Sequence, residues 1–435
     1  MDEALEGRTM RKIYLRLLPF AMFCYILAYL DRINGSFAAL TMRGDLNMSA
    51  GDYGFAVGTF YWAYFLFEVP SNVIMEKVGA RIWIARIMIT WGIFATATAF
   101  VTGTTSFSVL RFLLGAGEAG FFPGLILYFT YWFPARHHAR IVSGFLIGLP
   151  IAVAIGAPIS TGLMSLHGLF GFKGWQIMYF AEGLPTIVVG VVCYFVMTDK
   201  PEQATFLTQE EKDWLTKKLA SERKAKEKVR VYSFWESLWN PKVLLLSLNY
   251  FGIVTASLGI LFFVPQIIKS LGTLSNMQVG WVTMIPYICG AVALFAWGHL
   301  SDRKNERRWH LLAACVVSTF GLVLAGLTVG SWWSVVGVCL ATTGFYGSKG
   351  PFFAMPPMFL SGTALAAGIA WINSLGNLGG FFGPWWVGIM KDATGSFSGG
   401  LYGLALLTLV SSVVCALFLH IPDVTSKAGE FAPAE

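Results

Sequence analysis

The stretch YILAYLDRING, residues 25–35, places an aspartate and an arginine side by side within an apolar run from about residue 15 to residue 40. This run is long enough for one helix to cross a bilayer, which takes about 20 apolar residues. Charges are costly in hydrocarbon, so ionisable side chains inside a span mark functional sites by default. Asp31 and Arg32 therefore identify both a first membrane span and a candidate site.

The whole chain has the composition of a membrane protein. Of its 435 residues, 56% are hydrophobic and 13% are charged, and the mean hydropathy is +0.63. A soluble protein needs more charge to cover its surface. Helices satisfy every backbone polar group in a bilayer, so we expect an all-α polytopic membrane protein. Twelve helical spans are expected at 17–41, 53–76, 83–103, 106–131, 139–166, 176–197, 242–271, 276–302, 308–328, 332–358, 362–390 and 398–420.

The distribution of basic residues predicts the orientation of the chain. Lysines and arginines gather in the N-terminal tail, at 77–81, at 136–140, in the middle segment and at 303–308, whereas the alternate loops have few. The positive-inside rule then predicts that both termini and the middle segment are cytoplasmic. The formal net charge of +7 follows from this topology and requires no nucleic-acid partner.

One long polar stretch, 198–241, divides the spans into two groups of six. We expect an N-terminal six-helix bundle over 1–198, a cytoplasmic linker over 199–241, and a C-terminal bundle with a cytoplasmic tail over 242–435. Thr208 and Glu211 have the spacing of a capping box, which predicts a short surface helix within the linker.

The two halves carry short matching sequences, as expected of a duplicated transporter. GEAGFFPG at 117–124 aligns with SKGPFFAMP at 348–356, so that Glu118 corresponds to Lys349. NVIMEKVGAR at 72–81 and GHLSDRKNERR at 298–308 each place an acid and several bases at a cytoplasmic turn. These matches predict two pseudo-symmetric halves.

Several motifs occur in the order found in one transporter family. They are YLDRIN at 29–34, RFLLGAGEAGFFPG at 111–124, YWFP at 131–134, GHLSDR at 298–303 and INSLGNLGG at 372–380. With them the chain resembles the major facilitator superfamily, in its anion:cation symporter branch. It is similar to bacterial permeases for tartrate, para-hydroxyphenylacetate and phthalate, and more distantly to galactonate symporters.

The resemblance implies two six-helix bundles that rock about a central site and carry an organic anion together with protons. It implies proton coupling by Asp31 and Glu118, contact of Arg32 and Arg111 with the substrate or with these acids, and a working monomer. In the first half the family's loop signature is altered, because Asn72 replaces its usual glycine and Glu76–Lys77 replaces Asp-Arg. These changes keep the charges.

Helix geometry constrains the charged residues further. Asp31 and Arg32 point about 100° apart on one helix, so they cannot satisfy each other. Arg111 and Glu118 are two turns apart and share a face. If the first and fourth spans face each other, Arg32 can pair with Glu118, and Asp31 lies near another cation or in a wet cavity. The alternative is a buried ion-pair network that only holds the helices together.

Further polar residues are candidates for the substrate site. Lys349 could clamp a second carboxylate, or it could extend toward the cytoplasmic edge of the membrane. Asn373 and Asn377 share a helix face and could contact the substrate or bond across helices. Weaker candidates for the cavity wall are Tyr61, Tyr64, Asn249 and Gln266.

Other charged residues fit a gate at the cytoplasmic side. Glu68, Glu76, Lys77 and Arg81 lie near one cytoplasmic turn, and Asp302, Arg303 and Arg307 lie near the other. Ion pairs among them could hold this side closed and break during rocking. We expect no metal site, because the histidines and cysteines lack ligand spacing, and no cofactor other than the coupling proton.

The sequence thus predicts a proton-coupled symporter of the bacterial inner membrane that imports a small organic anion. The anion could be a hydroxy acid, a dicarboxylate, a sugar acid or an aromatic carboxylate. A uniporter or exchanger without proton coupling is the alternative. An intramembrane enzyme using Asp31 and Glu118 finds no support in a nucleophile motif, metal cluster or nucleotide loop. A transporter-like receptor would need a signalling domain, and none is visible.

Overall fold

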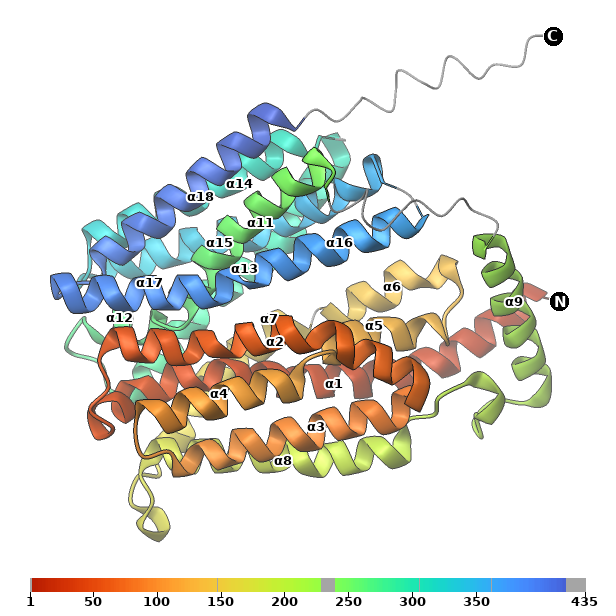
Figure 1. Cartoon of the computed structure of the whole chain (residues 1–435), viewed down its shortest axis with the longest axis horizontal. Coiled ribbons are helices and arrows are strands. Elements are labelled where there is room, and N and C mark those ends of the chain that lie inside the picture. The colour runs from red at the N-terminus through yellow and green to blue at the C-terminus, as the bar shows by residue number, and fades with distance from the viewer. Residues whose placement is uncertain (1, 147, 228–238, 305, 361, 420–435) are drawn as a thin grey trace.

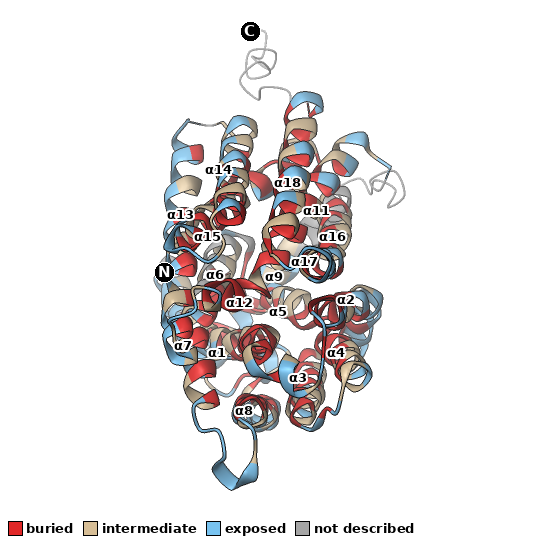
Figure 2. Ribbon diagram, turned by 90° about the vertical axis from the view of Figure 1, so that its left-hand side faces the viewer, coloured by how far each residue is buried: buried red, intermediate tan, exposed pale blue. Residues whose placement is uncertain are grey.

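A computed structural model describes residues 2–146, 148–227, 239–304, 306–360 and 362–419. Over these ranges the secondary structure is helical, without strands. The helices of the first half lie side by side in the lower part of Figure 1, and those of the second half lie above them. Viewed along the helices, each half keeps most of its buried residues between its helices (Figure 2).

The first half and the linker contain nine α-helices and three short 3₁₀ turns among the described residues. They are α1 (Asp2–Asp45), α2 (Ala50–Val78), α3 (Ala80–Ala97), η1 (Thr98–Phe100), α4 (Thr104–Glu118), α5 (Phe121–Thr130), α6 (Ala135–Leu146), α7 (Gly148–Met164), η2 (Leu169–Gly171), α8 (Gly174–Val196), η3 (Pro201–Gln203) and α9 (Gln209–Glu227).

The second half is built from a similar series of helices. They are α11 (Pro241–Leu261), α12 (Val264–Lys269), α13 (Asn276–Lys304), α14 (Arg308–Leu327), α15 (Trp332–Ala354), η4 (Pro356–Met358), α16 (Gly362–Asn377), α17 (Gly379–Thr394) and α18 (Ser398–Phe418).

The twelve predicted spans all fall on these helices. Among the described residues, nine helical segments are long and apolar enough to cross a membrane by themselves. The other three predicted spans are α2, α15 and the pair α16–α17. Two of them, α2 and α17, pack against each other between the halves.

Several spans are broken, which the sequence analysis did not predict. The span predicted at 106–131 consists of α4 and α5, and the break lies at Ala119 and Gly120. Gly120 adopts a φ of +88°, and a Cβ on Gly120 would lie 2.4 Å from the hydroxyl oxygen of Ser71. Only glycine fits both conditions. The spans predicted at 242–271 and 362–390 are likewise divided, at 262–263 and at Leu378.

The two halves are joined at one end by a group of contacts that we call the seam. Among the described residues, the side-chain hydrogen bonds between the halves are those of Arg43 with Gln266, Ala50 and Gly51 with Asp392, Tyr53 with Phe262, and Thr161 with Met277. In the first half, the bonds of Arg43, Ala50, Gly51 and Tyr53 lie where α1 ends and α2 begins, at the opposite end of the molecule from α9 (Figure 1). The bond of Thr161 with Met277 joins α7 to α13.

Close helix packing supports the seam. A Cβ on Gly54 would lie 2.2 Å from the carbonyl oxygen of Pro384, and one on Gly388 would lie 2.2 Å from that of Ala50. Glycines at these positions let the backbones of α2 and α17 touch.

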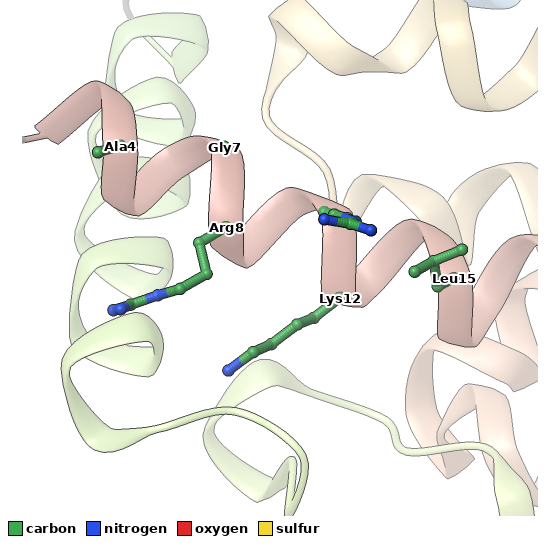
Figure 3. Close-up of a pocket in the computed structure, with 6 residues that line it drawn as sticks. Ala4, Gly7, Arg8, Lys12 and Leu15 are labelled. Atoms are coloured by element: carbon green, nitrogen blue, oxygen red, sulfur yellow. The ribbon is translucent and has the colours of Figure 1, made fainter.

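The predicted surface helix of the linker is confirmed as α9. Its capping box is present, because Glu211 N–H donates to Thr208 Oγ1 at 3.3 Å and Thr208 N–H donates to Glu211 Oε2 at 2.9 Å. The Glu211 carboxylate also accepts from Arg8 Nε (3.1 Å) and Lys12 Nζ (2.9 Å). Figure 3 shows these two basic side chains pointing from α1 toward the linker, so the N-terminal end of α1 holds α9 in place.

Candidate functional site

The first charged cluster centres on Arg32. Its guanidinium donates to Glu118, as the sequence predicted, and this ion pair is nearly buried: the side chains are 15% and 1% exposed. Aromatic rings surround the cation, with Tyr29, Phe60 and Tyr64 centroids 4.9, 5.1 and 5.4 Å from Arg32 Cζ. Aromatic faces stabilise a guanidinium that is removed from water.

The break in α4 positions Glu118. This residue is the last of α4, and the next residue, Ala119, leaves the helical conformation. Gly115, one turn earlier, allows α4 to approach α2 so closely that a Cβ would lie 2.2 Å from the Phe60 carbonyl oxygen. Glu118 Oε2 and Arg32 Nε are buried without a hydrogen-bond partner. The pair therefore keeps unused bonding capacity for a proton or a ligand.

Asp31 belongs to a second cluster, which lies within the first half. Its Oδ2 accepts from Trp91 Nε1 at 2.8 Å and from Thr186 Oγ1 at 2.9 Å, while Oδ1 is buried without a partner. The sequence analysis left a nearby cation or a wet cavity open for Asp31. The structure gives it hydrogen bonds from two neutral donors on α3 and α8 and a cation, Arg111, with which it interacts electrostatically.

Arg111 lies in this second cluster and is 2% exposed. Its Nη2 donates to Asn34 Oδ1 (3.3 Å) and to the Tyr179 hydroxyl (3.1 Å). Gly35 makes room for it, since a Cβ there would lie 2.0 Å from Nη2. Arg111 and Glu118 share a helix and interact electrostatically, but their hydrogen bonds lie in different clusters.

The sequence analysis overlooked Glu182, on α8. This carboxyl is buried, with 5% exposure, and its Oε1 accepts from Ser160 Oγ at 2.7 Å. Glu182 interacts electrostatically with Asp31. The sequence could have identified Glu182, because it is an acid within the apolar span 176–197, and the rule that singled out Asp31 applies to it equally.

Glu68 also differs from expectation. We placed it near the cytoplasmic gate, but it is 8% exposed and interacts electrostatically with Arg32. Its Oε2 is buried without a partner. Glu68 therefore belongs with the Arg32 cluster, as a second acid near that cation.

The second half presents tyrosines and polar residues toward the Arg32 cluster. Tyr29 interacts electrostatically with Tyr250 of α11 and with Tyr346 of α15. The half-buried Lys349 lies one turn after Tyr346, with Nζ 4.6 Å from the centroid of that ring. Among the described residues, Lys349 has no ion-pair partner.

The α16 asparagines lie beside Tyr250. Gly376, between Asn373 and Asn377, leaves no room for a Cβ, which would lie 2.0 Å from Tyr250 Cδ1. Both asparagines are half-buried. In the part of the chain that the structure describes, neither side chain makes a hydrogen bond, so both remain available to a ligand.

Three weaker candidates are placed as follows. Tyr61 is 3% exposed and its hydroxyl has no partner. Asn249 donates to Ser412 Oγ at 3.0 Å inside the second half, so it has a helix-packing partner, and its substrate contact stays a prediction. Gln266 accepts from Arg43 Nη1 at 2.6 Å and belongs to the seam.

The predicted gate residues remain within their own halves. Arg81 N–H donates to Asp199 Oδ1 at 2.8 Å, while Glu76 and Lys77 are exposed. In the second half, Asp302 pairs with Arg307 at 2.5 Å, and Arg303 is exposed. Over the described ranges no ion pair links the two groups, so their role in closing this end stays a prediction.

Comparisons with known proteins agree with this fold. The model of the family described as Major Facilitator Superfamily matches residues 21–384 and 273–434. A protein of Agrobacterium vitis, named as a candidate tartrate transporter, is 46% identical over 100% of both chains. The quinolone resistance transporter of Acinetobacter baumannii is 36% identical over 94% of both chains.

A solved structure gives the same result for the architecture. It is described as a bacterial homolog of the human lysosomal transporter Spinster in an inward-facing, unoccupied conformation. It matches with a TM-score of 0.78 at 15% identity, over 93% of this chain and 96% of that chain. The predicted fold, with its twelve spanning helices, is confirmed.

Proposed function

This chain belongs to the major facilitator superfamily and is a multi-pass membrane transporter rather than an enzyme, and from that premise we propose that it imports a small organic anion together with protons. The A. vitis relative named for tartrate supports a hydroxy acid or dicarboxylate as the substrate class. The relative named for quinolone resistance supports a site that can also admit an aromatic carboxylate.

The observation that carries the proposal is the buried pair of Arg32 and Glu118 inside a ring of aromatic side chains. A guanidinium in apolar surroundings binds a carboxylate strongly and can hold it in a fixed geometry. Arg32 already holds one carboxylate, that of Glu118. A substrate carboxylate must therefore compete with Glu118 for the same donors.

This competition couples the substrate to a proton. When Arg32 turns to the substrate, Glu118 loses its counter-charge in a buried site, and binding a proton removes the cost of that charge. The loaded transporter then carries a neutralised Glu118 and a paired substrate. When the proton leaves as the site opens to the cytoplasm, Glu118 recovers Arg32 and displaces the anion.

The second half completes the site in this proposal. Lys349, Asn373 and Asn377 lie near Tyr346 and Tyr250, which interact with Tyr29 beside Arg32. Lys349 would neutralise a second carboxylate, and the asparagines would bond hydroxyl or carbonyl oxygens.

We also propose that the units 1–198 and 242–435 rock as two bodies in a working monomer, with 199–241 as the linker.

For the orientation we propose the inner membrane of a bacterium with both termini in the cytoplasm, as the basic loops predict. The seam then lies at the periplasmic end. Since the hydrogen bonds between the halves gather there, the structure corresponds to the inward-facing state of the cycle. Import then requires the seam to open and the predicted gate of Glu76, Lys77, Arg81, Asp302 and Arg303 to close.

Uptake into sealed proteoliposomes tests the proposal. With tartrate on both sides of the membrane, exchange of labelled tartrate measures substrate binding and the rocking of the two halves. With an inward proton gradient, accumulation of tartrate inside the vesicles measures its coupling to protons. We expect Glu118→Gln to exchange but not to accumulate. Accumulation that persists in Glu118→Gln would contradict coupling through this acid, and wild-type uptake without response to the gradient would identify a uniporter or exchanger.

A further inference from the structure

The second buried cluster has more acids than bases. It contains two carboxyl groups, Asp31 and Glu182, and one guanidinium, that of Arg111. Both acids are buried, at 1% and 5% exposure. If both were ionised, one negative charge would lie uncompensated between the helices of the first half, which is strongly unfavourable in a low-dielectric interior.

Arg111 cannot compensate both acids from its position. Its electrostatic partner in this cluster is Asp31, and its hydrogen bonds go to Asn34 and Tyr179. Glu182 accepts a hydrogen bond from the Ser160 hydroxyl and also interacts with the Asn34 side chain, which is neutral. The carboxyl of Glu182 therefore has a hydrogen-bond donor but no cation.

The hydrogen bonds of the two acids also indicate that a proton is missing. Asp31 Oδ1 and Glu182 Oε2 are both buried without a partner, although the other oxygen of each carboxyl accepts a hydrogen bond. A buried carboxylate oxygen without a donor is costly. One proton added to the two acids would remove the excess charge and convert one of these two oxygens into a hydroxyl.

In the described part of the chain, the helices around α8 supply no second cation. The helices that pack against α8 are α1, α3 and α7. The charged side chains of α3 are Arg81 and Arg86, in its first two turns, whereas Asp31 contacts this helix at Trp91. From Gly148 to Met164, α7 carries no ionisable residue. On α1 the nearest cation, Arg32, is paired with Glu118.

We propose that Asp31 and Glu182 form one proton-binding site, two neighbouring carboxyl groups that together bind a single proton in one cluster with Arg111; Asp31 contacts α8 at Thr186, one turn from Glu182. Glu182 is thus a further proton-carrying residue, distinct from the Arg32–Glu118 pair. The proton is bound by one carboxylate of the pair and is released from it to water when the site opens. Its use in transport rests on the proposed symport, but its presence in the protein does not.

This site predicts that the two acids depend on each other. Glu182→Gln leaves Asp31 alone with Arg111, a balanced pair that no longer needs a proton. Asp31→Asn removes the neighbouring acid but still leaves Glu182 without a cation, so Glu182 keeps its proton and holds it less tightly. Glu182→Gln should therefore remove the proton from the cluster, whereas Asp31→Asn should keep it and release it more readily.

Infrared difference spectroscopy on the purified protein tests the site without transport. In pH-jump spectra, the carbonyl band of a protonated carboxyl group should be present in the wild type and in Asp31→Asn, and lost in Glu182→Gln. Asp45→Asn, which removes an exposed carboxylate paired with Lys173, should leave the band unchanged. A band that persists at full amplitude in Glu182→Gln would overturn the proposal.

A milder variant covers the case in which Glu182→Gln does not fold. Ser160→Ala keeps the acid and removes the hydrogen bond to Oε1, so the carboxyl band should shift in frequency without losing amplitude. An unshifted band in Ser160→Ala would show that the protonated group is not part of this pair.

Proteoliposomes then connect the site to transport. We expect Glu182→Gln to retain substrate exchange and to carry one proton fewer per substrate than the wild type. An unchanged ratio of protons to substrate would exclude Glu182 from coupling. If the wild type carries no protons, the proposed symport fails, and the infrared band still decides whether Asp31 and Glu182 share a proton.

Discussion

Arg32 of α1 and Glu118 at the end of α4 form a nearly buried ion pair that leaves one nitrogen and one oxygen without partners. Breaking such a pair by removing one partner strands the other charge. The residue that we propose binds the substrate and the residue that we propose binds the proton are therefore in direct contact. Through this contact, binding of a substrate at Arg32 would change the affinity of Glu118 for a proton.

Arg32→Ala should abolish binding of the organic anion. Loss of one partner in a buried charged contact typically costs about 2 kcal/mol or more, which corresponds to about 30-fold or more in affinity. Thermal stabilisation of the purified protein by tartrate measures this, because a ligand that binds only the folded state raises its stability. Arg11→Ala, at an exposed position of the N-terminal segment, is the matched control and should bind as the wild type does.

Lys349→Ala should separate dicarboxylates from monocarboxylates. If Lys349 holds a second carboxylate, the variant loses stabilisation by tartrate but keeps that by a monocarboxylate of similar size. The same thermal shifts measure both ligands in both proteins. Equal losses for the two ligands, or none for either, would assign Lys349 a structural role near Tyr346 instead.

Gly54→Ala should weaken the seam. The added Cβ would lie 2.2 Å from the Pro384 carbonyl oxygen, and overpacking of this kind costs about 1–3 kcal/mol. We expect a lower midpoint of thermal unfolding. Gly44→Ala provides the control, since a Cβ there meets nothing within 4 Å. Equal midpoints for the two variants would mean that α2 and α17 can move apart to admit the added Cβ without loss of folding free energy.

Docking of α9 on the N-terminal segment should depend on the charge of Glu211. Burial raises the pKa of this carboxyl. Hydrogen bonds from Lys12 and the Thr208 N–H, together with the charges of Lys12 and Arg8, lower it by more than burial raises it, so the net pKa lies below its ordinary 4.5. A lowered pKa means that the contact stabilises docking at all pH values above about 4.5. The stabilisation is lost as the pH falls through the lowered pKa.

A spin label at Lys217→Cys, on an exposed position of α9, measures this docking by its mobility. It should become mobile at neutral pH in Glu211→Gln and remain ordered in Glu210→Gln. Glu210 also contacts Arg8, at 3.5 Å, but its side chain is 67% exposed, and exposed ion pairs contribute little. An ordered label in Glu211→Gln would show that other contacts hold the helix.

The sequence by itself determined those features that depend on local pattern. Apolar runs of spanning length identified the helices, because hydrocarbon admits few alternatives. The capping box of Thr208 and Glu211 identified α9, because its two hydrogen bonds lie within one turn. The pairing of Arg32 with Glu118 followed only on the condition that the first and fourth spans face each other, and the structure fulfils that condition.

Only the tertiary structure decided which polar residues share a site and where the halves meet. Asp31, Arg111 and Glu182 come from α1, α4 and α8, and no spacing along the chain reveals that they form one cluster with two acids and one base. The seam likewise joins Asp392 to the start of α2, more than 300 residues away. Such contacts depend on how helices cross and on where glycines allow backbones to touch, which the pattern of a single helix does not encode.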